Sequence, residues 1–213
     1  PLIEVNGKPM IQLVVENLNI NANFIFIVQK EHYEKYNLQY LLHLIAPGCH
    51  IIQVDGVTQG AACTTLLAES LINNENPLLI ANSDQFLEWN SNECMYAFTA
   101  NGVDGGIVTF PATHPKWSYV SLDNEGFVEQ VAEKKVISNL ATAGLYFWKH
   151  GKEYVKHAQD MISHDIKVGN EFYVAPVYNN AIKAGAKIRV KNAQRMWGLG
   201  TPEDLNIFLE YNK

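Results

Sequence analysis

The sequence predicts an α/β fold with a mixed, mostly parallel central sheet, and three observations predict it. Short apolar runs rich in β-branched and aromatic residues alternate with longer segments of helical periodicity. The order strand–helix–strand–helix–strand in the first half requires crossover connections, which make the strands parallel. A later hairpin with a Gly-containing turn adds antiparallel strands, so the sheet is mixed.

The strands follow from β-branched and aromatic content. The runs that predict strands are residues 24–28, 51–54, 77–81, 106–110, 143–147 and 187–190. The hairpin pairs residues 118–122 with residues 127–131. No internal repeat, linker or domain boundary interrupts this pattern.

The helices follow from apolar residues at helical spacing. The segments that predict helices are residues 9–18, 31–45, 61–71, 148–163, 173–184 and 202–209. Pro9 stands in the first turn of the first helix, where its missing N–H costs nothing. Thr201 is the expected N-cap of the last helix, and Glu203 and Asp204 in its first turn suit the helix dipole.

The chain has the length and composition of one globular domain. Its 213 residues are 47% hydrophobic and 18% charged, which excludes disordered, collagen-like and coiled-coil classes. Its 16 basic and 22 acidic residues give a net charge of −6, without the basic footprint of a nucleic-acid partner. No apolar run approaches the ~20 residues of a membrane span, and we expect no signal peptide. Since Cys49, Cys63 and Cys94 are too scattered for a disulfide framework or a zinc site, we expect a cytoplasmic protein.

Ligands of open α/β sheets bind beyond the carboxyl ends of the strands, so the residues that follow those ends are the first candidates. After residue 54, Gly56 and Gly60 let the backbone approach a ligand closely. Gln59 offers both a donor and an acceptor, which suits the edge of a base. A plain strand-to-helix loop is the alternative interpretation.

Two charged residues are the next candidates. Asp84 follows a central apolar strand, where a carboxylate needs a partner or a metal ion. The alternative is an N-cap of a short following helix. Lys134 offers a compact ammonium for a phosphate, although a solvated charge run is the more general explanation. His114 follows another strand end and could line the same cleft, or it is an ordinary loop residue.

Several short motifs, in their order and spacing, resemble those of the sugar-phosphate nucleotidylyltransferases. The resemblance covers essentially the whole chain. Residues 1–11 are similar to the segment that follows the family's Gly-rich nucleotide loop. The other motifs are Gln59-Gly60, Ser83-Asp84, Glu133-Lys134, residues 142–147 and Gly200-Thr201-Pro202. The resemblance implies a Rossmann-like three-layer sandwich of the nucleotide-diphospho-sugar transferase type, formed by residues 1–213 as a single domain.

The resemblance also implies a role for each matching residue. Asp84 would hold Mg²⁺, and Asp84 and Lys134 would be the catalytic residues. The residues expected to bind the nucleotide are Gln59, Gly60, Ala61 and Ser83. The residues expected to bind the acceptor are Glu133, Gly144 and His114.

The chain departs from the family pattern at two places. The family's Gly-rich loop, with its Arg and the following catalytic Lys, would precede residue 1, so we expect the domain to lack it here. Many relatives have an Asp two residues before the closing Gly-Thr, where this chain has Gly198. The second metal ligand would then come from elsewhere, or phosphate oxygens and water would hold most of the Mg²⁺.

Residues 82–85, 114–119 and 198–204 are similar to a subgroup found in capsule and surface-glycan gene clusters. That subgroup includes a cytidylyltransferase that joins CTP to phosphoglutamine. The resemblance implies transfer of a nucleoside monophosphate, CMP from CTP, to a sugar phosphate or phosphoglutamine, with release of pyrophosphate. We expect no nucleic-acid or membrane partner, and the aromatic residues leave a homodimer open.

Two alternatives have other functions. A GT-A glycosyltransferase usually has two acidic residues at the strand end, whereas Gln85 and Phe86 follow Asp84 here. A non-catalytic nucleotide-binding regulatory subunit could share the same fold, because fold alone does not determine activity.

Overall fold

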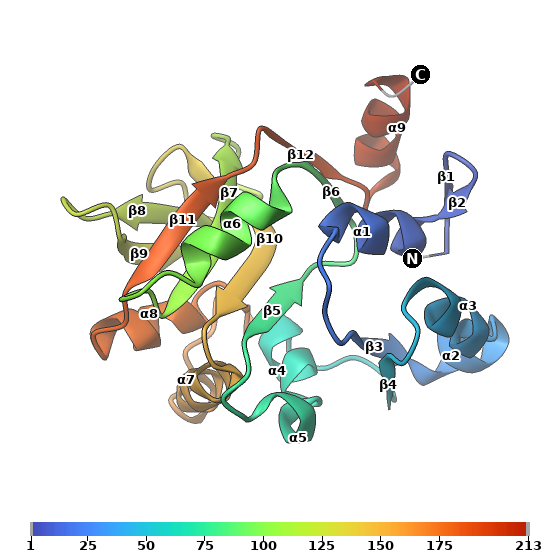
Figure 1. Ribbon diagram of the computed structural model, residues 1–213, viewed down its shortest axis with the longest axis horizontal. Helices are drawn as coiled ribbons and strands as arrows, with labels where there is room; N and C mark the ends of the chain where they lie inside the picture. The colour runs from blue at the N-terminus through green and yellow to red at the C-terminus, as the bar shows by residue number, and fades with distance from the viewer. Residues whose placement is uncertain (1, 212–213) are drawn as a thin grey trace.

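The computed structural model describes residues 2–211, which form a central sheet with helices on both faces (Figure 1). The helices are α1 (Met10–Leu18), α2 (Lys30–Lys35), α3 (Leu38–Ile45), α4 (Ala61–Leu66), α5 (Glu69–Ile72), α6 (Ser91–Phe98), α7 (Gly151–Ser163), α8 (Val177–Lys183) and α9 (Pro202–Tyr211). The strands are β1 (Glu4–Val5), β2 (Lys8–Pro9), β3 (Ile25–Gln29), β4 (His50–Val54), β5 (Leu78–Ala81), β6 (Gln85–Glu88), β7 (Gly105–Pro111), β8 (Tyr119–Leu122), β9 (Val128–Ala132), β10 (Leu140–Trp148), β11 (Ile188–Asn192) and β12 (Arg195–Gly198).

The central sheet has six strands in the order β11-β7-β10-β8-β9, with β5 also paired to β10. Strand β10 is antiparallel to β5, β7 and β8, and β11 is parallel to β7. Strands β5, β7, β8 and β11 therefore run one way, and β9 and β10 run the other way. This confirms the predicted mixed sheet with most strands in one direction. Smaller sheets pair β3 with β4, β6 with β12 and β1 with β2.

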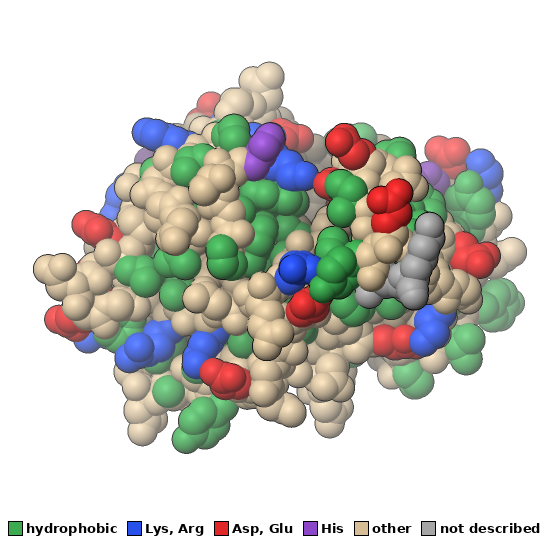
Figure 2. All heavy atoms as spheres, turned by 90° about the horizontal axis from the view of Figure 1, so that it is seen from above, with side chains coloured by type: hydrophobic (Ala, Val, Ile, Leu, Met, Phe, Trp, Pro, Cys, Tyr) green, Lys and Arg blue, Asp and Glu red, His purple; other side chains and the backbone are tan. Residues whose placement is uncertain are grey.

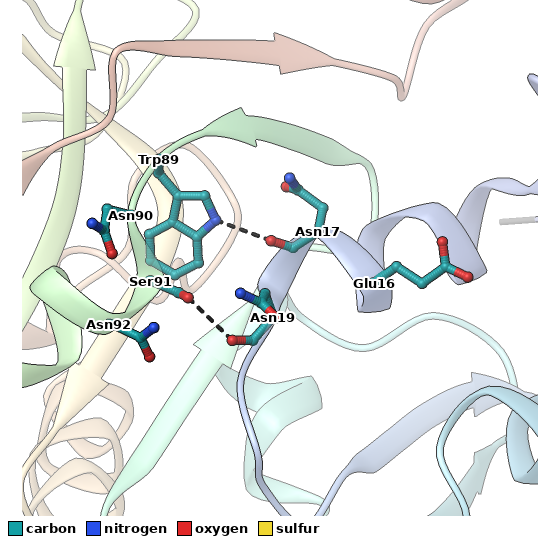
Figure 3. A pocket seen from close by; sticks show the side chains of 7 residues that line it. All are labelled: Glu16, Asn17, Asn19, Trp89, Asn90, Ser91 and Asn92. Carbon is teal, nitrogen blue, oxygen red and sulfur yellow. Dashed lines mark hydrogen bonds between the residues drawn. The ribbon is translucent and has the colours of Figure 1, made fainter.

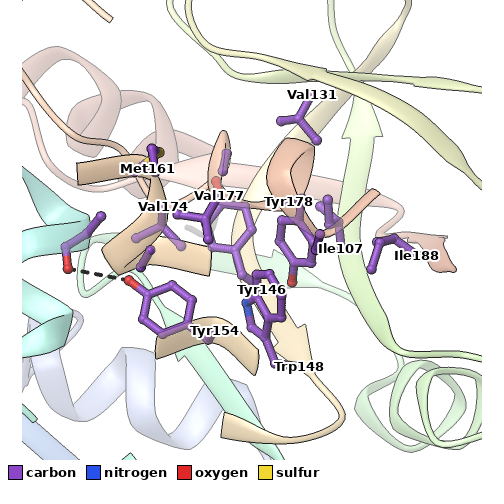
Figure 4. Packing of buried hydrophobic residues seen from close by; sticks show 14 of the residues in the cluster. Ile107, Val131, Tyr146, Trp148, Tyr154, Met161, Val174, Val177, Tyr178 and Ile188 are labelled. Atoms are coloured by element: carbon purple, nitrogen blue, oxygen red, sulfur yellow. Dashed lines mark hydrogen bonds between the residues drawn. The ribbon is translucent and has the colours of Figure 1, made fainter. Parts of the chain in front are cut away.

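Helices cover both faces of the sheet, which gives the predicted three layers. Because side chains alternate along a strand, β10 contributes to two different cores. Tyr146 and Trp148 pack with residues of α4, α5, α7 and α8 on one face (Figure 4). Leu145 and Phe147 pack with Phe98 of α6 on the other face. The sheet is thus buried on both faces, so a ligand would bind at the ends of its strands.

Stacked aromatic rings fill the core beneath α7 and α8. The Trp148 ring stacks on Tyr178, with 4.3 Å between the ring centroids (Figure 4). The buried Tyr178 hydroxyl donates a hydrogen bond to the Phe147 carbonyl at 2.7 Å. A buried hydroxyl without an acceptor would destabilise the fold, so this contact lets tyrosine occupy the centre of the core.

Each predicted strand overlaps an observed one, and the predicted hairpin forms from β8 and β9. The first and last helices also confirm the prediction, and the Thr201 hydroxyl caps α9 by accepting the Asp204 N–H at 3.2 Å. Within residues 2–211, no helix is long and apolar enough to cross a lipid bilayer.

Two predicted helices are wrong as single helices. The segment 31–45 forms α2 and α3, because Asn37 adopts a left-handed conformation with φ of 48° between them. The segment 61–71 forms α4 and α5, and Ala68 between them is not helical. In both cases the apolar residues keep their helical spacing across residues whose backbone is not helical.

Two more predicted helices begin too early. Trp148 is the last residue of β10 and pairs with Leu78 and Gly105. Tyr173 lies in a loop, and α8 begins only after Pro176, because a proline disfavours helical geometry at the preceding residue. Helix α6 and the β6–β12 ribbon were not predicted at all.

Candidate functional site

Asp84 lies in the connection between β5 and β6, so a strand and not a helix follows it. This excludes the N-cap interpretation of Asp84. The Leu199 N–H donates a hydrogen bond to the Asp84 carbonyl at 2.7 Å, which ties this loop to the end of β12. A Cβ on Gly200 would collide with Asp84 Oδ2, so glycine is required to leave room for the carboxylate.

The electrostatic surroundings of Asp84 oppose its ionisation. Desolvation by burial raises the pKa of the Asp84 carboxyl, and the charge of Asp204 raises it further. Asp204 itself is partly buried, but hydrogen bonds from Lys116 and Thr201 outweigh that burial and lower its pKa. Lys116 Nζ lies 3.0 Å from Asp204 Oδ1. The carboxylates of Asp84 and Asp204 thus influence each other, and the Lys116 ammonium pairs with Asp204.

Gly144 lies beside this loop, at an irregularity of β10 and with φ of 68°. Its carbonyl accepts the Asn82 N–H at 2.9 Å. The buried amide of Gln85 lies where a Gly144 side chain would stand, so a Cβ there would collide with Gln85 Oε1. Glycine at this position therefore leaves room for the Gln85 and Asn82 side chains next to Asp84. Ser83 is exposed in the same loop.

Glu133 and Lys134 follow β9, and both side chains have partners. The Ser118 hydroxyl donates a hydrogen bond to the half-buried Glu133 carboxylate, whose pKa is nevertheless raised by desolvation. Lys134 has φ of 53° and its Nζ donates to the Tyr173 hydroxyl at 2.5 Å. The Tyr173 hydroxyl in turn donates to the Glu171 carboxylate. The hydrogen bond with Tyr173 raises the pKa of Lys134, whose side chain is exposed.

The Gln59-Gly60 turn is held by Phe172. The Phe172 N–H donates to the Gln59 carbonyl at 2.8 Å, and the Ala62 N–H donates to the Phe172 carbonyl at 2.9 Å. Gly60 has φ of 121°, and a Cβ there would lie 2.5 Å from the Phe172 carbonyl oxygen. The side chains of Gln59 and Ala61 are exposed at the start of α4, where a ligand can reach them.

These contacts join the predicted site residues into one connected set, in which each residue touches or adjoins the next. The order is Gln59, Phe172, Tyr173, Lys134, Glu133, Ser118, Thr142, Ala143, Gly144, Gln85, Asp84, Gly200. The link in its middle is the Thr142 N–H, which donates to the Ser118 carbonyl at 2.8 Å. His114 belongs to the neighbouring loop, where its Nδ1 accepts the Lys116 N–H at 3.2 Å.

Sequence reasoning did not assign a site role to Tyr173, Glu171, Lys116 or Asp204. Tyr173 was placed in a helix, and Asp204 was explained by the helix dipole alone. Lys116 and Asp204 lie in segments that carry the resemblance, 114–119 and 198–204, but no local pattern assigns a site role to any of the four residues. The signal is the tertiary contact of Tyr173 with Lys134 and of Lys116 with Asp204.

A hollow lies elsewhere, between the end of α1 and the start of α6 (Figure 3). It encloses about 410 Å³, and none of the predicted site residues lines it. Trp89 Nε1 donates to the Asn17 carbonyl at 3.0 Å, and the Ser91 hydroxyl donates to the Asn19 carbonyl at 3.1 Å. The Trp89 and Ser91 donors therefore already have acceptors within the protein.

The donor set suits Mg²⁺ better than a transition metal. Among residues 2–211, no group of three or more His, Cys, Asp or Glu side chains could enclose a metal ion. Mg²⁺ usually takes one or two carboxylates and completes its shell with water and substrate phosphates. The Asp84 carboxylate, whose Oδ2 lies where a Gly200 side chain would stand, is of the type that this mode of binding uses.

Charge on the surface agrees with a small-molecule ligand. Figure 2 shows basic and acidic side chains interspersed on this face of the molecule, without a continuous basic field. A nucleic-acid-binding surface would gather its Lys and Arg side chains on one face or along one groove.

The fold and the site define an α/β protein whose glycine turns and carboxylates gather at strand ends, as in nucleotide-binding sheets. The Nucleotidyl transferase family matches residues 1–185, and the chain belongs to this family. It is therefore a nucleotidyltransferase enzyme. This confirms the resemblance to nucleotidylyltransferases, whereas the narrower resemblance to the phosphoglutamine cytidylyltransferase stays a prediction.

Solved structures share the fold at low sequence identity. A nucleoside-diphosphate-sugar pyrophosphorylase from Vibrio cholerae is 21% identical with a TM-score of 0.83, over 98% of this chain and 90% of that one. A structure described as a glucose-1-phosphate thymidylyltransferase from Bacillus anthracis is 17% identical with a TM-score of 0.77, over 99% and 85%. A UDP-glucose pyrophosphorylase complexed with UDP-glucose is 15% identical with a TM-score of 0.75, over 99% and 90%. No curated protein sequence matches the chain.

Proposed function

We propose that this enzyme transfers CMP from CTP to a small phosphorylated acceptor and releases pyrophosphate. One observation carries the proposal: a connected set of contacts joins the Gln59-Gly60 turn, Lys134, Glu133, Gly144 and Asp84. A turn for a base, a carboxylate for a metal ion and a charged pair for an acceptor are the parts that such a transfer requires.

The chemistry is a displacement at phosphorus. An acceptor phosphate oxygen attacks the α-phosphorus, a new P–O bond forms, and the bond to the β-phosphate oxygen breaks as pyrophosphate leaves. Mg²⁺ bound at Asp84 would neutralise charge on the triphosphate. The protein positions the two substrates in line and stabilises the charge that is redistributed.

Lys134 would steady the reacting phosphates. Its ammonium is fixed by the Tyr173 hydroxyl at 2.5 Å and is held charged by it, which suits an anionic ligand. The exposed amide of Gln59 would contact the base, and the backbone at Gly60, Ala61 and Ser83 would contact the nucleotide. The preference for CTP rests on the resemblance of the chain, since an amide can pair with more than one base.

Glu133, Gly144 and His114 would bind the rest of the acceptor. Glu133 and Glu171 both lie beside Lys134, and their negative charges complement an ammonium group. An amino-acid phosphate carries a phosphate and an ammonium together, so phosphoglutamine is the first acceptor to test and sugar phosphates are the second.

Thermal unfolding with each nucleoside triphosphate, with and without Mg²⁺, tests the nucleotide half of the proposal. A ligand at about 100 times its Kd stabilises a protein by roughly 2.7 kcal/mol, or about 5–10 °C for a domain of this size. We expect a Mg²⁺-dependent shift that is largest with CTP. Equal shifts with all triphosphates would contradict the CTP preference, and no shift with any would contradict nucleotide binding.

Pyrophosphate release tests the reaction itself. We expect release only when CTP and a phosphorylated acceptor are both present, and we expect none from the Asp84→Asn variant. Release with sugar phosphates and not with phosphoglutamine would replace the favoured acceptor. Binding of CTP without any release would favour the non-catalytic nucleotide-binding alternative.

The remaining parts of the proposal rest on the resemblance. We infer a role in capsule or surface-glycan biosynthesis in the cytoplasm, with no nucleic-acid or membrane partner. A homodimer and a single domain over residues 1–213 stay predictions.

A further inference from the structure

We propose that Asp204, from the first turn of α9, supplies a second carboxylate to the metal ion held by Asp84. The carboxylate would reach the site through the space that Gly198 leaves open. This inference rests on the proposed function, because it concerns the Mg²⁺ that the transfer reaction would use.

Side chains at Gly198 and Gly200, if they were present, would point at the two carboxylates. Gly198 and Gly200 flank Leu199, whose side chain is 1% exposed and packs in the core with Val5 and Met10. A side chain at Gly200 would point directly into the Asp84 carboxylate. A side chain at Gly198 would point at Asp204, with its Cβ 3.2 Å from Oδ2 and 3.3 Å from Cγ. The two glycines thus open one short segment of backbone to two carboxylates.

Asp204 is held in place by a hydrogen bond and by the packing of α9. The Thr201 hydroxyl donates a hydrogen bond to Asp204 Oδ2 at 2.9 Å. Helix α9 is fixed to the β6–β12 ribbon by Phe208, whose ring lies 5.2 Å from Phe86 and 5.9 Å from Trp197 between centroids. Because β6 begins directly after Asp84, one ribbon fixes the position of both aspartates. Metal ligands held in this way bind with little cost in side-chain entropy.

The charges of Asp84 and Asp204 favour a cation between them. Lys116 Nζ lies 3.0 Å from Asp204 Oδ1, so its ammonium already balances part of the negative charge of the two aspartates. Its side chain is 43% exposed, which lets the ammonium move aside when a cation of higher charge binds. A divalent ion between Asp84 and Asp204 would neutralise both carboxylates, as two ligands of one Mg²⁺ do.

The test is Mn²⁺ binding to the whole chain, followed by electron paramagnetic resonance, with and without CTP. We expect Asp204→Asn to weaken Mn²⁺ binding at least tenfold, as Asp84→Asn does. Glu203→Gln is the matched control, because Glu203 is an exposed carboxylate in the same turn of α9, and we expect its affinity to equal that of the unchanged chain. Asparagine keeps an oxygen for the Thr201 hydroxyl, so the cap of α9 is retained in Asp204→Asn.

Lys116→Gln gives a readout in the opposite direction. Removal of the competing ammonium should tighten Mn²⁺ binding, because Asp204 Oδ1 is then free. If Asp204 only pairs with Lys116 and Thr201, Asp204→Asn will leave Mn²⁺ affinity unchanged, which would overturn the proposal. Unchanged or weaker binding in Lys116→Gln would also overturn it, as would no Mn²⁺ binding by the unchanged chain.

The two proposals fail separately. Mn²⁺ binding that needs both aspartates, in a chain that releases no pyrophosphate with any acceptor, would keep the metal site and reject the proposed reaction. Pyrophosphate release that survives in Asp204→Asn with unaltered Mn²⁺ affinity would keep the reaction and reject Asp204 as a ligand.

Discussion

Asp84 illustrates, at the scale of a residue, how a site is maintained at the expense of stability. Burial raises the pKa of its carboxyl, so the folded protein holds that proton more tightly than the unfolded chain does. The stability that comes from this shift is full at low pH, below the unfolded pKa. It is lost as the pH rises through the raised pKa of the folded state, and at neutral pH the ionised carboxylate opposes folding.

Replacing Asp84 with asparagine should therefore separate stability from activity. We expect Asp84→Asn to raise the free energy of unfolding at pH 7, because it removes the buried charge. At about pH 3, where the carboxyl is protonated in both states, we expect little difference. Pyrophosphate release should fall at least about 100-fold, as when an electrostatic group of an active site is removed. Urea unfolding at both pH values checks the first part, and lower stability at pH 7 would contradict it.

Tyr173 acts on Lys134 through one hydroxyl group. We expect Tyr173→Phe to raise the KM for the acceptor about fivefold, since one hydrogen bond contributes about 1 kcal/mol. The KM for the nucleoside triphosphate should not change, because the Gln59 turn is held by the Phe172 backbone. Tyr40→Phe is the control, as that side chain is 76% exposed. Steady-state kinetics with each substrate varied in turn measures both KM values. An unchanged acceptor KM in Tyr173→Phe would show that Tyr173 does not act on the acceptor through Lys134.

At the scale of elements, the site depends on close approaches of backbone that only glycine permits. The loop between β4 and α4 contains two glycines with positive φ, Gly56 at 75° and Gly60 at 121°. Only Gly60 meets another segment, since a Cβ there would lie 2.5 Å and 2.6 Å from backbone atoms of Phe172. At Gly56 no atom lies within 4 Å of the Cβ position.

This pair gives a matched test of the turn. Gly56→Ala should cost about 1 kcal/mol of unfolding free energy, from the backbone conformation alone. Gly60→Ala should cost more than about 2 kcal/mol, because a backbone collision is added to that strain. Nucleotide-induced stabilisation should survive in Gly56→Ala and be lost in Gly60→Ala. Denaturant unfolding with and without CTP measures both effects, and equal costs would show that Phe172 moves aside easily.

For the molecule as a whole, the site rests on two cores that share one sheet. Phe98 of α6 is fully buried and stacks near Phe147 of β10, with 5.7 Å between the ring centroids. It also covers Gly106, where a Cβ would collide with its ring. Phe98 thereby covers the face of the sheet that carries Phe147, on strands β7 and β10.

We expect Phe98→Ala to destabilise the protein by about 3–5 kcal/mol, through the lost burial and the cavity that remains. Tyr96→Ala on the same helix is the control, because Tyr96 is 82% exposed and should change stability by less than about 0.5 kcal/mol. Equilibrium unfolding in urea distinguishes the two. A small effect of Phe98→Ala would mean that α6 repacks against β7.

The sequence by itself determined the class of fold, the strands and the residue types of the site. The β-branched and aromatic content of short apolar runs is a local property, so the strands were predicted close to their observed positions. Asp84, Gly60 and Lys134 could be singled out because charge and glycine at strand ends are visible in the sequence. Helix ends were less predictable, as at Asn37 and Trp148, because left-handed residues and strand pairing override helical spacing.

The tertiary structure alone decided which distant residues complete the site. Tyr173 is 39 residues from Lys134, and Asp204 is 88 residues from Lys116, yet each pair is joined by a hydrogen bond. No local periodicity encodes such contacts, since they depend on the order of strands in the sheet and on where α9 packs. The position of Asp204 beside Gly198 is of this kind: the sequence shows a glycine and a helix cap, and folding brings the carboxylate to the open space.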